Sequence, residues 1–233
     1  MKQKIFKLGL LGKKYLDTVV HLESFTRGET NLSTKVYKTC GGIFNILKAN
    51  VASTIIYPYI DSQVEAIIVS ESNTSTRSSI IHSLSQKTKP DIQEGLIDWL
   101  HVAYIDDLIH KNILNNFKTK ISLDFCTLNP RRKYLDVINK ASLIFDSRER
   151  KPLYKDVEFK TPLILHDKYG CECIIEGSVV YEGFTNPHDN IHVNGAGDIF
   201  AGIFISEYYN STLENAVKST SELTTKHIIK NEI

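Results

Sequence analysis

The chain has 233 residues, of which 42% are hydrophobic, so it can bury the core of one large domain or of one domain with a small appendage. Lysine and arginine number 28, aspartate and glutamate number 27, and the formal net charge is +1. This balance gives no electrostatic reason to expect a nucleic acid or an anionic membrane surface as the main partner.

The sequence shows no pattern typical of a secreted or membrane-spanning chain. Lys7, Lys13 and Lys14 interrupt the apolar stretch near the N-terminus, whereas a signal peptide needs roughly 7–15 uninterrupted apolar residues. No segment approaches the roughly 20 apolar residues of a spanning helix. We therefore expect a cytoplasmic protein.

The cysteines form no Cys-x-x-Cys pair, and a soluble chain of this size does not need disulfides. Cys171 and Cys173 lie in an alternating stretch, which puts both side chains on one face of a strand. We expect reduced, buried thiols at the four positions, which are Cys40, Cys126, Cys171 and Cys173.

The first half of the chain shows short strand patterns and one helix. The apolar run Ile5–Leu11 ends at Gly12 and predicts a buried strand. The chain breaks at Cys40-Gly41-Gly42, and apolar residues at helical spacing then predict a helix over Ile43–Ala52. The other strands predicted here are Thr18–Leu22, Ser33–Lys38, Ser53–Ile60 with a stop or bend at Pro58, Val64–Val69, Thr76–Ser83 and Trp99–Ile105. The strands over 64–69 and 76–83 predict a hairpin.

The second half alternates strand and helix patterns, which is typical of βαβ units and a largely parallel sheet. Continuous apolar runs, without alternation, fit strands that are buried on both faces. The predicted elements are helices at Leu108–Phe117, Tyr134–Lys140, Ile199–Tyr209 and Leu213–Ile229, strands at Ile121–Leu123, Ser142–Phe145 and Pro162–His166, and a hairpin over Cys173–Phe184. We predict one α/β domain over residues 1–233.

Three of these strands end in aspartate, at Asp124, Asp146 and Asp167. Ligands of open α/β sheets bind beyond the carboxyl ends of the strands, so these carboxylates would crowd the binding edge. Crowded carboxylates repel one another unless a cation such as Mg²⁺ joins them. Alternatively, each aspartate merely starts the following loop or caps a helix. Both interpretations stay open.

The segment Asn194-Gly195-Ala196-Gly197-Asp198 precedes an apolar helix and carries the chemistry. Its glycines let the backbone approach a ligand closely, and the first turn of the helix offers unpaired N–H groups at a positive dipole end. That combination binds anions and would stabilise the charge on a transferring phosphoryl group. Asp198 stands where a carboxylate can take the proton of an attacking hydroxyl.

This segment resembles the second signature of the ribokinase-like (PfkB) carbohydrate kinase family, which reads D-T-x-G-A-G-D. Other segments resemble family motifs in the family's order. They are Gly12-Lys13-Lys14-Tyr15-Leu16-Asp17 for G-x-x-x-x-D, Thr26-Arg27-Gly28-Glu29-Thr30 for P-x-x-G-E-T, Cys40-Gly41-Gly42-Ile43-Phe44-Asn45 for G-G-x-x-x-N, and Asp146-Ser147-Arg148-Glu149 for N-x-x-E.

The resemblance implies a ribokinase-like fold: a mostly parallel central sheet between helices, with a small β lid from segments near 18–38 and 64–83. It implies transfer of the γ-phosphate of ATP, with Mg²⁺, to a hydroxyl of a sugar-like substrate, and a homodimer paired through the lid. The implied catalytic residues are Asp198 with Gly195, Ala196 and Gly197. The candidate ligand-binding residues are Asp17, Gly41, Gly42, Asn45 and Arg77 for the substrate, Asp146, Glu149, Asp167 and Gly170 for the nucleotide, and Glu149 and Asp124 for the metal. Arg77 comes from the predicted hairpin and Asp124 from the strand-end aspartates, rather than from the resemblance.

The sequence also departs from the family pattern, mostly on the nucleotide side. His192 and Val193 replace Asp and Thr before the GAGD core, which puts potassium activation in doubt. Cys40 replaces the first glycine of the first signature, and Asp146 replaces an asparagine. The T-x-G-x-x-G turn survives only as Asp167-Lys168-Tyr169-Gly170, and the G-x-D-x-x-G segment is absent.

These departures keep an alternative open, in which the chain is a catalytically inactive sugar- or nucleotide-binding protein on the same fold. A dinucleotide-binding oxidoreductase would need G-x-G-x-x-G after the first strand, and a P-loop enzyme would need G-x-x-x-x-G-K-[ST]; both patterns are missing. His188-x-x-x-His192 has metal-ligand spacing, but Pro187 favours a loop there. Arg77 is either a substrate-phosphate contact or a solvated hairpin residue.

Overall fold

The computed structural model describes residues 5–49, 54–74, 76–105, 112–125, 135–155, 157–158, 160–188 and 194–231. Ten strands within this part of the chain form one sheet in the order β10-β9-β8-β7-β6-β5-β1-β3-β4, and β2 pairs with β1 outside that path. The strands are β1 (Phe6–Leu22), β2 (Lys35–Gly42), β3 (Thr54–Glu71), β4 (Thr76–Leu84), β5 (Trp99–Ala103), β6 (Lys120–Asp124), β7 (Leu143–Ser147), β8 (Leu163–Asp167), β9 (Gly170–Ile175) and β10 (Ser178–Phe184).

The predicted parallel sheet is confirmed in its centre, where the six strands in the order β3-β1-β5-β6-β7-β8 pair parallel with one another. Strands β8, β9 and β10 pair antiparallel and close one side of the sheet. All five residues of β5 are buried, as continuous apolar runs predict for strands covered on both faces. The hairpin of β9 and β10 lies where the sequence predicts it.

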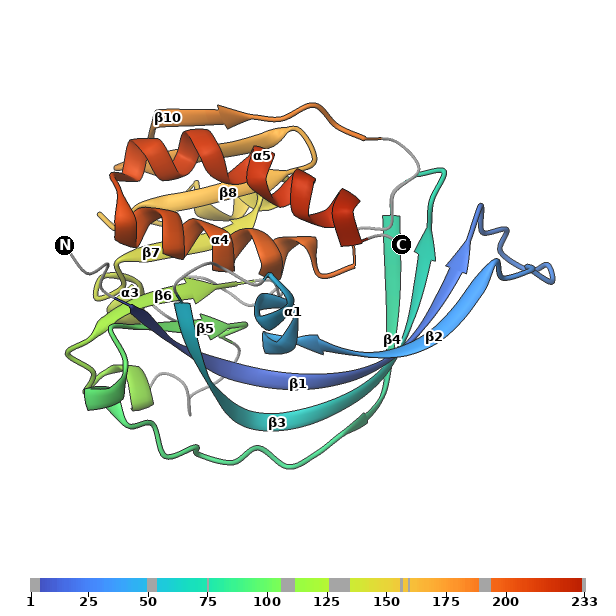
Figure 1. Cartoon of the computed structure of the whole chain (residues 1–233), viewed down its shortest axis with the longest axis horizontal. Coiled ribbons are helices and arrows are strands. Elements are labelled where there is room, and N and C mark those ends of the chain that lie inside the picture. Colours follow the sequence, from blue (N-terminus) through green and yellow to red (C-terminus); the bar gives the residue numbers. More distant parts are fainter. Residues whose placement is uncertain are drawn as a thin grey trace.

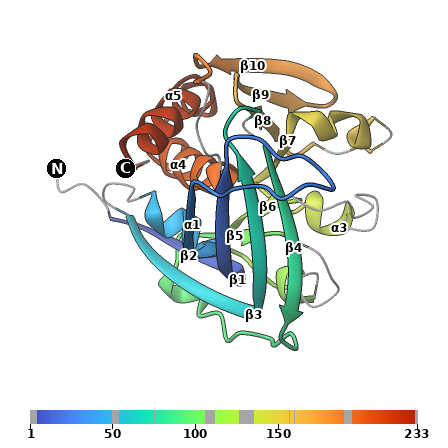
Figure 2. The same cartoon turned by 90° about the vertical axis from the view of Figure 1, so that its right-hand side faces the viewer.

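Helices cover both faces of this sheet, as Figure 2 shows with α1, α4 and α5 on one side and α3 on the other. The helices are α1 (Ile43–Lys48), α3 (Leu135–Ile138), α4 (Ala196–Asn210) and α5 (Leu213–Asn231), and the 3₁₀ segments are η1 (Glu94–Leu96) and η3 (Arg148–Tyr154). None of the helices in the described part of the chain combines the length and apolar character that a bilayer crossing requires.

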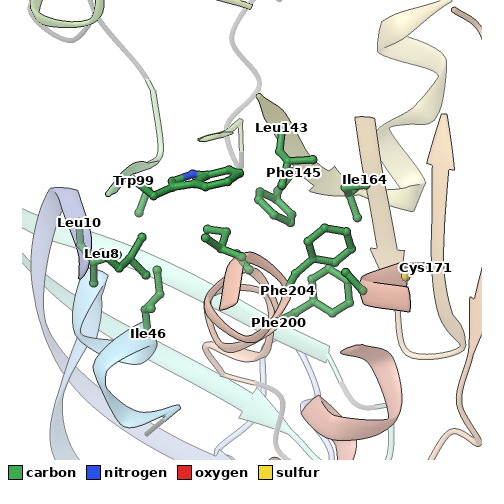
Figure 3. Close-up of a cluster of buried hydrophobic side chains, with 14 of the residues drawn as sticks. Leu8, Leu10, Ile46, Trp99, Leu143, Phe145, Ile164, Cys171, Phe200 and Phe204 are labelled. Carbon is green, nitrogen blue, oxygen red and sulfur yellow. The ribbon is translucent and has the colours of Figure 1, made fainter. Parts of the chain in front are cut away.

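The hydrophobic core has one large cluster on each face of the sheet. On the α4 face, Phe200 and Phe204 pack against Phe145 with ring centroids 6.4 and 5.4 Å apart. Figure 3 shows these rings with Trp99 and Cys171 in one group of side chains. Trp99 and His101 are fully buried, so both are core residues. The buried Cys171 and Cys173 share one strand, also as predicted.

Two of the predicted breaks in strands are wrong. The segments Ile5–Leu11 and Thr18–Leu22 belong to one strand, β1, because it pairs with β3 along its whole length and absorbs a register shift at Gly12/Lys13. The stop at Pro58 is also absent, and β3 runs through it. β4 pairs with β3 only from Val64 onward, so Pro58 lies in the part of β3 that has β1 on one side only, where a missing N–H is tolerated.

The outer halves of β1 and β3 leave the core and, with β2 and β4, build a four-stranded β-extension. We define the β-extension as residues 13–22, 35–42, 62–71 and 76–84. Figure 1 shows these strands curving away from the helices. A small cluster of Val19, Ala66 and Ile68 with Tyr15 and Tyr37 holds them together. The predicted helix start is confirmed, since α1 begins at Ile43 directly after Gly42, whereas β2 runs through Cys40 and Gly41 to Gly42, past the predicted strand end at Lys38.

Candidate active site

The turn before α4 has the geometry that the Gly195-Ala196-Gly197 segment predicts. Gly195 is left-handed (φ +79°) and precedes the helix, which begins at Ala196. The Ile199 N–H bonds the Gly195 carbonyl at 3.0 Å. The amides before Ile199 belong to the first turn, where a helix supplies no partner for its N–H groups. They therefore form a positive helix end that suits an anion.

Asp198 lies in this first turn, and its side chain is 5% exposed. The Asn45 side-chain amide donates a hydrogen bond to Asp198 Oδ2 at 2.8 Å. The hydroxyl of Tyr104 donates a short hydrogen bond to the other oxygen, Oδ1. The carboxylate is therefore directed toward α1 and toward the carboxyl end of β5, which ends one residue before Tyr104.

Asn45, in α1, packs against the turn that precedes α4. A Cβ on Gly195 of that turn would be 2.5 Å from Asn45 Nδ2. Lys48, one turn later in α1, donates to Asn45 Oδ1 at 3.2 Å. This bond fixes the amide so that its NH₂ group faces Asp198. Sequence reasoning found Asn45 and Gly195 from the motifs but did not find Lys48.

Lys48 joins α1 to the end of β2. Its ammonium donates to Thr39 Oγ1 at 3.0 Å and to the Cys40 carbonyl at 2.7 Å. Burial lowers the pKa of Lys48, and the nearby groups Cys40, Asp17 and Asp198 oppose that shift. Lys48 still has a solvent-exposed surface, and its side chain interacts electrostatically with the carboxylates of Asp17 and Asp198. Its position three residues after Asn45 was the one available signal in the sequence.

Asp17 and Gly41 lie next to this network. Asp17 is 5% exposed on β1, and a Cβ on Gly41 would be 2.4 Å from Asp17 Oδ2. Gly42 is left-handed (φ +63°) and turns the chain from β2 into α1. The structure thus brings Asp17, Gly41, Gly42 and Asn45 to the same end of the sheet as Asp198. The side chain of Arg77 and all of His192 lie outside the described residues.

The carboxylate of Asp146 has protein partners. It accepts hydrogen bonds from Arg150 at 3.0 Å and from the Tyr154 hydroxyl at 2.7 Å. Asp167 pairs with Arg148 at 3.0 Å. Arg150 and Arg148 therefore supply positive charge beside two of the three strand-end aspartates.

Asp167 also organises the turn between β8 and β9, because its Oδ1 accepts the N–H groups of Tyr169 and Gly170 at 2.8 and 3.1 Å. Gly170 has a φ of +146°, and a Cβ there would be 2.1 Å from the Gly183 carbonyl oxygen. Both residues therefore have a structural role in the hairpin. This bears out, for Asp167, the alternative that the aspartate starts a loop.

The other two acidic residues lie at or just after the ends of two neighbouring parallel strands. Asp124 is 5% exposed at the end of β6, and Glu149 is exposed in η3, two residues after β7. Over the described ranges, no three histidine, cysteine or acidic side chains gather as a group that could hold a metal ion. The interpretation in which Asp124, Asp146 and Asp167 share one cation is therefore contradicted, and Asp146 and Asp167 pair instead with Arg150 and Arg148.

His166 is a further residue of the site that sequence reasoning missed. Its ring stacks on Phe200, with centroids 4.6 Å apart, and a Cβ on Gly197 would be 3.2 Å from the ring. Burial lowers the pKa of His166 to about 4, so the ring is neutral at pH 7. It therefore packs against the Gly195–Gly197 turn without adding charge. A histidine next to Asp167 carried no distinguishing signal in the sequence.

Comparison with known proteins gives similarity in structure alone. Neither a protein-family model nor a curated protein matches the sequence. A nucleoside kinase from Burkholderia thailandensis, solved with inosine, superposes with a TM-score of 0.73 at 13% identity, covering 95% of this chain and 90% of that one. Adenosine kinase from Sinorhizobium meliloti gives 0.71 at 13% identity, covering 95% and 93%. Ribokinase from Cryptococcus neoformans, solved with ADP, gives 0.69 at 15% identity, covering 94% and 92%.

Proposed function

We propose that this chain, whose fold is ribokinase-like, transfers the γ-phosphoryl group of ATP to a hydroxyl of a sugar or sugar-like molecule. One observation carries the proposal. The carboxylate of Asp198 is buried in the first turn of α4, three residues after the left-handed Gly195, and is oriented by Asn45. The names of the structural neighbours, which include nucleoside kinase and ribokinase, support the same reaction class.

In this proposal Asp198 accepts the proton of the acceptor hydroxyl as its oxygen attacks phosphorus. The amides of Gly195, Ala196 and Gly197 and the dipole of α4 stabilise the charge on the transferring phosphoryl oxygens. Catalysis then depends mainly on the fixed positions of these groups, because phosphoryl transfer needs little covalent chemistry from the protein.

Asp17, Gly41, Gly42 and Asn45 would bind the acceptor, together with Arg77, whose role remains a prediction from the sequence. Asp17 and Asn45 are polar and almost fully buried, and both lie close to the charge of Lys48. A carboxylate and an amide are suited to the paired donors and acceptors of neighbouring sugar hydroxyls. Gly41 leaves the space that Asp17 occupies.

The nucleotide would lie on the side of Asp146, Glu149, Asp167 and Gly170, with the phosphates toward the helix end. Glu149 and Asp124 are oxygen donors on adjacent strand ends, and two carboxylates are enough for Mg²⁺, which keeps several of its waters in protein sites. Bound Mg²⁺ would neutralise charge on the phosphates. The neutral His166 adds no competing charge beside the turn.

The β-extension would act as a lid that keeps water away from the phosphate during transfer. Its outer face carries exposed apolar side chains from three strands, with Val36 at 56%, Ile67 at 38% and Ile80 at 60% exposed. We propose that this face pairs with a second copy of the chain to form a homodimer. The molecular mass in solution tests this, and a monomer at micromolar concentration would contradict it.

A second candidate function is binding without catalysis. The observation that favours it is that Asp146 and Asp167, both on the proposed nucleotide side, are held by Arg150 and Arg148. Turnover decides between the two candidates, because a binding protein retains a ligand and produces no phosphorylated product.

The first prediction concerns Asp198→Asn. Incubation with ATP, Mg²⁺ and a panel of sugars, sugar phosphates and nucleosides should identify an acceptor that the wild type phosphorylates. Loss of the general base should lower kcat by about 10²- to 10⁴-fold, because the asparagine amide cannot take the proton. Phosphorylated product is measured by mass spectrometry.

Asp91→Asn is the matched control, since Asp91 is an exposed residue outside the site and should leave turnover unchanged. If the wild type binds an acceptor but forms no product, the non-catalytic candidate is correct. If Asp198→Asn turns over as fast as the wild type, Asp198 is not the base.

A further inference from the structure

Tyr104 has an unusual backbone conformation for its residue type. Its φ is +73°, and among the described residues other than glycine only Glu176, in the tight β9–β10 turn, also has a positive φ. A non-glycine residue in this left-handed region costs of the order of 1 kcal/mol or more, so the surrounding structure must hold it there. Such strain often accompanies function.

The side chain of Tyr104 reaches the proposed catalytic base. Its hydroxyl donates to Asp198 Oδ1, across 94 positions of sequence. The two oxygens of Asp198 differ in their surroundings: the bond from Asn45 to Oδ2 is buried, whereas the bond from Tyr104 to Oδ1 is only partly buried. Tyr104 is half-buried whereas Asn45 is buried, so the Tyr104 side of the carboxylate is the more accessible of the two.

The ring of Tyr104 also contacts the strand that enters the β-extension. It lies edge-on to Tyr15, with centroids 6.4 Å apart and an interplanar angle of 87°. Tyr15 is two residues before Asp17 on β1 and packs against the Val19 cluster. Tyr104 thus lies between the β-extension and Asp198, within reach of a molecule bound at Asp17.

We propose that Tyr104 is a gating residue, whose hydroxyl holds the position on Asp198 Oδ1 that the acceptor hydroxyl takes during transfer. This inference rests on the proposed function. Both the tyrosine and a sugar hydroxyl carry an O–H group that can donate to Oδ1, so the sugar hydroxyl can take the place of the tyrosine hydroxyl. Before the acceptor binds, Tyr104 keeps water from that position and so suppresses hydrolysis of ATP.

The suppressed reaction has a simple balance. A water oxygen would bond to the γ-phosphorus, the bond from phosphorus to the bridging oxygen of ADP would break, and Asp198 would take the water proton. Loss of the tyrosine hydroxyl opens the Oδ1 position to water. Because water is the acceptor in this reaction, the test does not require the sugar-like acceptor to be known.

The experiment compares ATP hydrolysis, with Mg²⁺ and without any acceptor, in the wild type and in Tyr104→Phe. We expect Tyr104→Phe to hydrolyse ATP at least about 5-fold faster, because a hydrogen bond to a charged group no longer competes with water. Tyr104→Phe/Asp198→Asn should lose this gain. Tyr208→Phe is the matched control, since Tyr208 packs on Trp99 near the far end of α4. This variant should hydrolyse ATP at the wild-type rate.

A second measurement tests the hydrogen bond without any turnover. In protein labelled with [¹³Cζ]tyrosine, the Tyr104 resonance is assigned from its absence in Tyr104→Phe, and it should shift in Asp198→Asn. An unshifted resonance overturns the inference whatever the activity is. Hydrolysis that stays equal or falls in Tyr104→Phe, in an enzyme that turns over ATP, overturns the gating role. A shifted resonance in a protein that uses no ATP in any variant shows that the proposed function has failed, and the gating role falls with it.

Discussion

At the scale of single residues, the orientation of one amide governs the proposed active site. Asn45 gives its NH₂ group to the Asp198 carboxylate and its oxygen to the Lys48 ammonium. The reverse orientation would set oxygen against carboxylate and NH₂ against ammonium, and both contacts would be repulsive. Lys48 therefore acts as a positioning residue for Asn45, and Asn45 in turn fixes the proposed base.

The space for this amide depends on a residue without a side chain. Gly195→Ala should lower the free energy of unfolding by about 3 kcal/mol, because alanine resists the left-handed conformation and its Cβ would overlap Asn45 Nδ2. Phosphoryl transfer should be lost as well. Chemical denaturation and the product assay measure the two effects.

Gly28→Ala is the control that separates conformation from overlap. Gly28 has a similar φ of +86°, but a Cβ there would have no neighbour within 4 Å. Gly28→Ala should lower the free energy of unfolding by only about 1 kcal/mol, the penalty of the backbone conformation alone. Equal losses of stability in the two variants would contradict a close Gly195–Asn45 contact.

At the scale of elements, the site depends on the packing of α1 against α4, which places Asn45 beside Asp198. The two helices meet at Gly202, where a Cβ would be 2.6 Å from Ile46 Cγ2. Gly202→Ala should therefore destabilise the protein by about 1 kcal/mol, since overpacking outweighs the gain in helix propensity. Thermal or urea unfolding measures the change.

A double-variant cycle makes this prediction specific to the helix contact. In an Ile46→Ala background the overlapping methyl group is gone, so Gly202→Ala should become neutral or stabilising, even though Ile46→Ala itself creates a cavity. A Gly202→Ala effect that is the same in both backgrounds would show that the two helices do not meet there.

At the scale of the whole molecule, buried neutral histidines connect stability to pH. Burial lowers the pKa of His101 to about 3 and that of His166 to about 4, against about 6.5 in an unfolded chain. The unfolded state therefore binds more protons between these values. Their contribution to stability is fully present above pH 6.5 and is lost as the pH falls toward 4.

Urea denaturation between pH 7 and pH 4 should show this loss, on the order of a few kcal/mol. His101→Gln cannot ionise, and it keeps an amide that can replace the 2.8 Å bond to Ser122. It should flatten the pH dependence, whatever its effect at pH 7. An unchanged slope would mean that His101 does not contribute to it.

Much of the sheet could be predicted from the sequence because each pattern there has a local cause. The run Leu163-Ile164-Leu165 is apolar without alternation, which predicts a strand buried on both faces, and all three residues are buried in β8. Of the predicted stop or bend at Pro58 the stop was wrong, and so was the break between Leu11 and Thr18, because pairing with a neighbouring strand carries β3 and β1 through these positions.

The parts of the site differ in the same way. By itself, the sequence determined Gly195, Asp198, Asn45 and Asp17 as candidates, since a glycine turn, a helix start and short motif spacing are local properties. Only the tertiary structure decided that Tyr104 reaches Asp198, that Lys48 orients Asn45, and that arginines balance Asp146 and Asp167. Most of these contacts join residues on separate elements. A hydrogen bond depends on distance and direction in space, which the order of residues along the chain does not contain.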